Sequence, residues 1–108
     1  MMDLPKTFAA LSDATRFAIV EKLLTDGAQP AGDLAQVSDI SAPAISRHLK
    51  VLREAGVISQ TVQGQHRIYA VRPEAMQAIS GWTISHRRFW EGSLNRLAAA
   101  LDDLEDKT

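Results

Sequence analysis

The segment SAPAISRHLKVLREAG, residues 41–56, presents hydrogen-bond donors at helical spacing. Ile45, Leu49 and Leu52 follow one another at steps of four and three, which predicts that they form the buried stripe of a helix. The opposite, outward face comprises Ala42, Pro43, Ser46, Arg47 and Lys50. Guanidinium, ammonium and hydroxyl groups donate to phosphate oxygens and to base edges, so this face is a candidate surface for binding double-stranded DNA.

Each of these side chains suits a particular part of a DNA duplex. Arg47 has the fork geometry of a bidentate contact to guanine, and Ala42 could meet a thymine methyl group. Ser46 could bond a base edge or a phosphate. Lys50 and Arg53 lie further along the helix and suit phosphates, which position a protein without reading sequence. The competing interpretation is a basic helix face that is only solvated.

Two histidines and an arginine are further candidates. His48 falls between the inward and outward faces, so a partly buried structural histidine is the favoured interpretation and a phosphate contact is the alternative. His66 and Arg67 follow the polar tip at residues 63–65, where they could reach a flanking minor groove or its phosphates. The alternative for Arg67 is an ordinary surface residue.

Charge is segregated along the chain. Residues 41–72 hold five basic side chains against the single acid Glu54, which gives this window a charge of +4. The formal net charge of the chain is -1, so the remainder carries -5. A basic surface of this kind is what contact with phosphates requires. The five basic residues are Arg47, Lys50, Arg53, Arg67 and Arg72.

The periodicity of apolar residues predicts four helices before residue 57. The first spans 4–11, the second runs to about Asp26, the third spans 30–37 and the fourth is 41–56. We expect Ser12 or Asp13 to cap the second helix, Pro30 to lie in the first turn of the third, and Ser41 to cap the fourth. The predicted inward residues of the second and third helices are Phe17, Ile19, Val20, Leu23, Leu24, Leu34 and Val37.

The pattern then changes to that of a hairpin. Residues 57–62 and 66–71 alternate and are rich in β-branched residues, and Gly64 can adopt a positive φ in the connection. A helix from Pro73 to about Ser80 follows, then a break or kink at Gly81, and a long final helix over about 82–105. This order predicts a mainly α single domain over 1–108, a winged helix-turn-helix.

The final helix carries an apolar seam. Its members step by four, three, four and three residues, which is the spacing of a helix that pairs with another helix. They are Trp90, Leu94, Leu97, Leu101 and Leu104. Together with Leu4 and Phe8 of the first helix, they predict a homodimer whose two-fold axis sets two recognition helices about one DNA turn apart. The alternative is packing within one subunit.

The composition excludes several other classes. The chain has 108 residues and no cysteine, so it has neither disulfides nor thiolate ligands. It lacks the apolar segment of a signal peptide and any membrane span, which favours a cytoplasmic protein without a membrane partner. Its glycines form no phosphate-binding loop, and its histidines lack a catalytic partner at useful spacing, so we do not expect an enzyme. The histidines are His48, His66 and His86.

Three stretches resemble the ArsR/SmtB family of bacterial repressors. They are DATRFAIVEKLL (13–24), ISRHLKVLREAGVI (45–58) and GQHRIYAV (64–71), and the resemblance extends over about residues 4–105. It implies a homodimer paired through its first and last helices, which binds an operator, represses nearby genes and is released by an effector. The family's DNA contacts would fall on Ala42, Pro43, Ser46 and Arg47. It also suggests a structural Arg16, paired with an acid such as Asp13 or Glu21.

The sequence departs from the family where metals are sensed. The cysteines of the arsenic and cadmium sensors would fall on Pro30 and Gly32, although Asp33 is kept. Of the zinc ligands on the last helix only His86 is present, and one histidine does not make a zinc site. We therefore expect no metal and no cofactor. The counterparts of the later zinc ligands are Leu97 and Ala100.

The start of the final helix is rich in aromatic residues, which does not decide what kind of effector, if any, the protein binds. Trp82, Phe89 and Trp90 could line a pocket for a small apolar molecule, although plain packing of aromatic rings is the favoured interpretation. A protein effector, or no effector, is also compatible with the sequence. The alternative function from another class is a protein-interaction module that acts through this aromatic helix.

Overall fold

The computed structural model describes residues 2–106 and divides the chain into two compact units. The first unit ends at Ala78, and the second begins at Ile79. The first unit contains the predicted helix-turn-helix and hairpin, and the second contains most of the long final helical segment. The expectation of a single domain over 1–108 stays a prediction.

The first two helices begin at aspartate caps. In α1 (Leu4–Leu11) the Asp3 carboxylate accepts a hydrogen bond from the backbone N–H of Lys6, and in α2 (Ala14–Asp26) Asp13 accepts from Arg16. The cap of α2 is therefore Asp13 rather than Ser12. As expected, α2 ends at Asp26, and Gly27 follows it with a φ of 79° that favours glycine.

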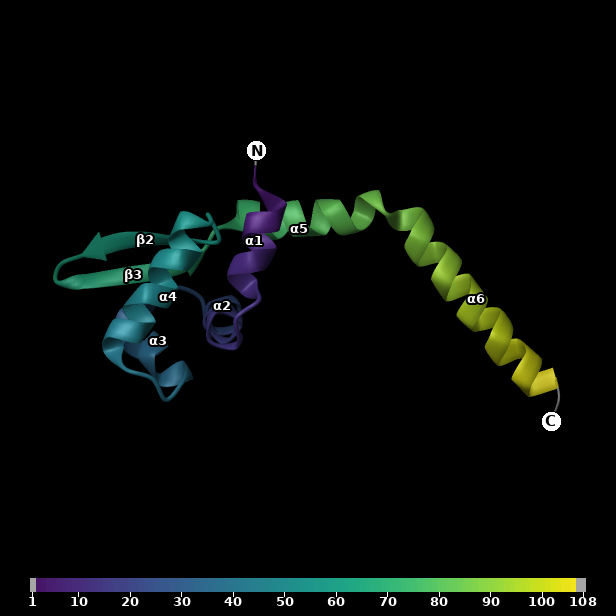
Figure 1. The fold of residues 1–108 in the computed structure, drawn as a ribbon, viewed down its shortest axis with the longest axis horizontal. Helices are drawn as coiled ribbons and strands as arrows, with labels where there is room; N and C mark the ends of the chain where they lie inside the picture. The colour runs from purple at the N-terminus through teal and green to yellow at the C-terminus, as the bar shows by residue number, and fades with distance from the viewer. Residues whose placement is uncertain (1, 107–108) are drawn as a thin grey trace. The chain divides into compact units, whose positions relative to one another are not determined.

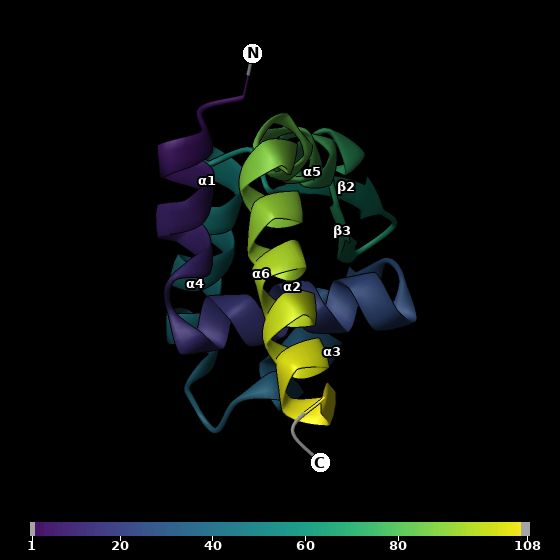
Figure 2. The ribbon, with the colours of Figure 1, turned by 90° about the vertical axis from the view of Figure 1, so that its right-hand side faces the viewer.

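The helix-turn-helix forms from α2, a short helical segment and α4. The short segment consists of α3 (Ala31–Leu34) and a 3-10 turn, η1 (Ala35–Val37). Pro30 precedes α3 in an extended conformation instead of lying in its first turn. The recognition helix α4 (Ala42–Glu54) has the expected cap, since the Ser41 hydroxyl accepts from the Ala44 backbone N–H. Figure 1 shows α4 beside the hairpin, and Figure 2 shows α1 and α4 side by side.

The wing is a hairpin of β2 (Ile58–Gln63) and β3 (His66–Val71), with Gln63 paired to His66. The loop therefore has two residues, and Gly64 adopts a φ of 60°, the pattern of a type II′ turn. A strand that we did not predict, β1 (Gln29–Pro30), pairs antiparallel with β3, so the sheet order is β1-β3-β2. Two residues that include a proline are too short to show strand periodicity.

The buried core of the first unit joins α2, α3, α4 and the sheet. The predicted stripe Ile45, Leu49 and Leu52 is buried, and Tyr69 of β3 packs into the same core. The prediction was wrong for Phe17 and Leu24, which are 53% and 52% exposed. Within the described residues of the first unit, no element covers the outer face of α2. Val37 is half-buried, while the remaining predicted inward positions, Ile19, Val20, Leu23 and Leu34, are buried.

Two helices follow the sheet, α5 (Pro73–Ser85) and α6 (Arg87–Asp106). The predicted break at Gly81 was wrong, because α5 continues through Gly81 and stops at Ser85. A glycine weakens a helix without preventing it. At the actual break, the Ser85 hydroxyl and His86 Nδ1 both lie within hydrogen-bond distance of the Trp82 carbonyl, at 2.7 and 2.8 Å. Such side-chain bonds compete with the backbone bonds of a helix.

Among residues 2–106, no helix combines the length and the apolar character that a membrane span needs.

Candidate nucleic-acid interface

Burial of one stripe of α4 directs its other face toward solvent. With Ile45, Leu49 and Leu52 each no more than 3% exposed, the helix cannot turn its outward face inward without removing them from the core. All five residues predicted to face outward are exposed: Ala42, Pro43, Ser46, Arg47 and Lys50. The N-terminal half of α4 is thus an exposed surface of small and donor side chains, as a helix that enters a major groove requires.

The basic side chains of α4 are available for an external partner. Arg47 and Arg53 are exposed and form no ion pair with any residue between 2 and 106. Lys50 Nζ lies 3.9 Å from Glu54 Oε1, but both side chains are more than 60% exposed. An exposed pair of this kind contributes little, so phosphate oxygens can replace Glu54 as the partner of Lys50.

The outer half of the wing protrudes from the unit. Every residue from Thr61 to Arg67 is exposed, which shows that neither face of the hairpin packs there. His66 and Arg67 lie opposite Gln63 and Val62, directly beside the tip. The base is fixed by the buried ring of Tyr69, whose hydroxyl donates to Gln60 Oε1 at 3.1 Å. The structure therefore presents both predicted wing residues on an arm anchored beside α4.

His48 occupies the partly buried position that we favoured. Its side chain is 23% exposed, and its Nδ1 lies 3.3 Å from Arg16 Nη1 and 3.8 Å from Asp13 Oδ2. The backbone N–H of Arg16, followed by the charges of His48 and Arg16, holds the pKa of Asp13 below its ordinary value of 3.8, against a smaller opposing effect of desolvation. These contacts favour a structural role for His48 over a phosphate contact.

Arg16 is structural, but its partners differ from the expected carboxylates. Its Nε donates to the Ala10 carbonyl at 2.7 Å and Nη2 donates to the Ala9 carbonyl at 3.5 Å. The guanidinium thus neutralises the negative end of α1, whose last turn contains no basic residue. Arg16 donates its backbone N–H to the Asp13 carboxylate, but among the described residues its guanidinium forms no ion pair with Asp13 or Glu21.

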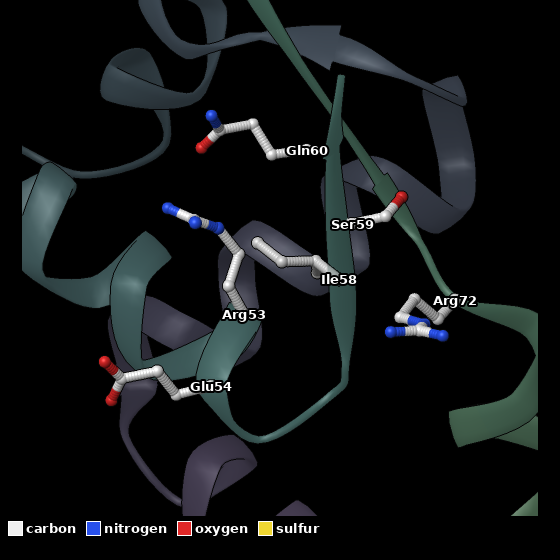
Figure 3. A pocket seen from close by; sticks show the side chains of 6 residues that line it. All are labelled: Arg53, Glu54, Ile58, Ser59, Gln60 and Arg72. Atoms are coloured by element: carbon white, nitrogen blue, oxygen red, sulfur yellow. The ribbon is translucent and has the colours of Figure 1, made fainter.

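Sequence reasoning missed a cavity at the base of the wing. It has a volume of about 380 Å³ and is lined by Arg53, Glu54, Ile58, Ser59, Gln60 and Arg72. In Figure 3, Arg53 and Gln60 extend on one side of β2, whereas Ser59 and Arg72 lie on the other. The two guanidinium groups do not converge. The basic pair Arg53 and Arg72 within residues 41–72 was the only sequence signal for this cavity. Its lining comes from the end of α4, from β2 and from Arg72, which directly follows β3.

The predicted dimer and pocket residues are exposed or half-buried. Trp90, Leu94, Leu97, Leu101 and Leu104 are 48–62% exposed, while Phe8 is exposed and Leu4 is half-buried. Trp82, Phe89 and Trp90 are also exposed, and the cavity described above contains none of them. The Phe89 and Trp90 rings meet edge to face with centroids 6.0 Å apart.

Within the described part of the chain, no three His, Cys, Asp or Glu side chains are grouped so that they could hold a metal ion. His86 bonds the Trp82 carbonyl and the Ser85 hydroxyl.

Comparison with known proteins agrees with this architecture. A family model described as a helix-turn-helix domain matches residues 11–61. The chain is 36% identical to the HTH-type transcriptional regulator Rv2034 of Mycobacterium tuberculosis over 103 residues, 95% of this chain and 92% of that protein. It is 40% identical to the transcriptional repressor SdpR of Bacillus subtilis over 78 residues, 72% of this chain and 86% of that protein.

Solved structures give the same assignment. The crystal structure of the ArsR family transcriptional regulator RHA00566 superposes with a TM-score of 0.73 and 31% identity, covering 82% of this chain and 96% of that one. These similarities favour a regulator that binds DNA over a protein-interaction module. The chain belongs to the ArsR family of winged helix-turn-helix transcriptional regulators, which bind DNA.

Proposed function

We propose that this regulator is a repressor that binds a pseudo-palindromic operator as a homodimer. The observation that carries the proposal is the exposed donor face of α4 beside a protruding basic wing. Arg47 would contact guanine in the major groove, and Ala42, Pro43 and Ser46 would lie against neighbouring base edges. Lys50, Arg53, His66 and Arg67 would bind phosphates or the flanking minor groove.

The homodimer is supported by the apolar seam of α6. Five large apolar side chains, each about half exposed or more, lie along a 20-residue helix. Exposed apolar stripes of this length are uncommon on monomers and mark interaction surfaces. A second copy of the same helix presents a matching stripe, and Leu4 and Phe8 of α1 would extend the interface.

Charge along α6 favours an antiparallel pair. The helix begins with Arg87 and Arg88, and its last turns contain four acids and no base: Asp102, Asp103, Glu105 and Asp106. Both ends carry the sign that opposes the helix dipole, so these charges weaken an isolated α6. In an antiparallel pair, the basic start of each helix would meet the acidic end of its partner, as a two-fold axis allows.

The proposed regulation needs no metal. Pro30, Gly32, Leu97 and Ala100 stand at positions where the metal-sensing members of the family have metal ligands. The exposed Trp82, Phe89 and Trp90 make a small apolar molecule or a protein the candidate effector. No catalytic step is involved. The proposal includes a cytoplasmic location, because an operator-binding protein must reach the DNA.

The test is a gel shift on the DNA upstream of the protein's own gene, with excess non-specific competitor and with or without a chelator. A discrete complex that survives the chelator supports metal-independent, sequence-specific binding. Loss of the complex on chelation would overturn metal independence. A complex removed equally by any competitor DNA would overturn sequence specificity.

A further inference from the structure

Arg16 joins three helices of the DNA-binding unit. It lies in the first turns of α2, its Nε and Nη2 donate to carbonyls of the last turn of α1, and its Nη1 lies 3.3 Å from His48 of α4. His48 directly follows Arg47, the residue proposed to read guanine. A guanidinium therefore lies between the end of a predicted dimer helix and the middle of the recognition helix.

The chemistry of this contact fixes the state of the imidazole. A guanidinium has only donors, so the contact with Arg16 requires a free lone pair on His48 Nδ1 and places the proton on Nε2. The same Nδ1 lies 3.8 Å from Asp13 Oδ2, which becomes its ion-pair partner only when the imidazole is charged. The two groups that face His48 Nδ1 therefore both belong to the start of α2, with Arg16 in its first turn and Asp13 at its N-cap.

We propose that Arg16 is a positioning residue for operator binding, which acts through His48 to set the orientation of α4 relative to α1. The inference rests on the proposed operator binding and deepens it. A helix rotated by a small angle keeps its buried stripe but moves Ser46 and Arg47 against the base edges, where hydrogen bonds tolerate little displacement. Phosphate contacts made by flexible side chains are less sensitive to that rotation.

A double-mutant cycle tests whether Arg16 acts through His48. Arg16→Lys keeps the charge but loses the fork geometry, and His48→Leu removes the acceptor. Each single change should lower operator affinity about 2- to 10-fold, the range of one hydrogen bond, and Arg16→Lys should lower it less than about twofold in the His48→Leu background. Additive losses would overturn the proposal.

The conservative variant His48→Asn supplies the matched control. The asparagine Oδ1 can replace Nδ1 as an acceptor, so this variant should retain most of the affinity that His48→Leu loses. Affinity for non-specific DNA should be unchanged in Arg16→Lys, because Arg16 is not among the proposed DNA contacts. A parallel loss of non-specific affinity and a smaller salt dependence would instead show that His48 contacts a phosphate.

A measurement on the free protein separates this inference from the proposed function. Proton–nitrogen correlation spectra identify the tautomer of His48 at a pH where the imidazole is neutral, with His48→Asn providing the assignment. We expect the proton on Nε2 in the wild type and a mixture of tautomers in Arg16→Lys. A proton on Nδ1 in the wild type would overturn the Arg16–His48 contact even if the protein binds its operator. An Nε2 proton that gives way to a mixture of tautomers in Arg16→Lys would uphold that contact even if no operator is found, and the same tautomer in both proteins would overturn it.

Discussion

Arg47 combines exposure with the absence of an intramolecular ion pair in the described chain. Its guanidinium is available to a guanine because the buried stripe of α4 directs this side of the helix outward. Arg47→Ala should therefore weaken binding to a specific site by about 1–3 kcal/mol and relax the base preference at one position of each half-site. Competition binding on operators with single base changes measures both effects. An unchanged base preference would show that Arg47 does not read sequence.

Arg67 should behave differently because it lies on the wing. Arg67→Ala is expected to weaken binding to all DNA sequences similarly and to lower the slope of log affinity against log salt concentration by about one. Titrations at several salt concentrations, on specific and random duplexes, provide the comparison. A loss confined to the specific site would assign base reading to the wing.

Asp13 links stability to pH. Its folded pKa is lowered, chiefly by the Arg16 backbone N–H, so its carboxylate stabilises the fold above the unfolded pKa near 3.8. That contribution is lost as the pH falls through the lowered folded pKa. Asp13→Asn keeps a capping side chain but removes the charge, so it should lower the free energy of unfolding at neutral pH and flatten its acid dependence. Denaturant titrations of the wild type and Asp13→Asn, from neutral pH to below the pKa of Asp13, measure this dependence. If both proteins lose the same free energy of unfolding on acidification, Asp13 does not link stability to pH.

Single residues also show where sequence reasoning succeeds. The exposure of Ser46 and Arg47 and the partial burial of His48 follow from their places between Ile45 and Leu49, because helical spacing is local. The partners of Arg16 could not be predicted, since they depend on the approach of α1 to α2 and α4. A carboxylate was the obvious partner for a guanidinium, but the carbonyls at the end of α1 lie closer.

At the scale of elements, local signals placed most boundaries. Asp13, Gly27, Ser41 and Gly64 each act as a cap or turn through their own backbone and side-chain chemistry, which makes them readable from sequence. Elements without such a signal were missed. The strand β1 exists because β3 pairs with it, and the end of α5 depends on side chains that bond the Trp82 carbonyl.

The seam of α6 gives a prediction at this scale. Leu97→Glu places a charge in the middle of the proposed interface, where burial of an unpaired carboxylate is unfavourable. Sedimentation should therefore show a monomer that binds the operator poorly. Ala99→Glu is the matched control, because it adds the same charge two residues away, on another face of the same helix. A Leu97→Glu protein that remains a dimer would refute the α6 interface.

The whole molecule combines a DNA-binding unit with a final helix whose large apolar side chains are exposed. The exposed apolar residues of α2 and α6 have no covering element among the described residues of their own units. Sequence composition could not decide whether a partner covers them, because an apolar stripe has the same pattern whether it packs within a chain or between chains. The basic start and acidic end of α6 favour a second copy of the chain as the element that covers its apolar stripe.

The most direct test of the central claim is selection of binding sites from random-sequence duplexes by the full-length protein. A homodimer of recognition helices predicts an enriched inverted repeat, with a guanine in each half-site and half-site centres about 10–10.5 base pairs apart. Enrichment of that repeat would establish sequence-specific binding by two copies of α4. A selection that enriches no sequence, or only a single unrepeated half-site, would contradict the account.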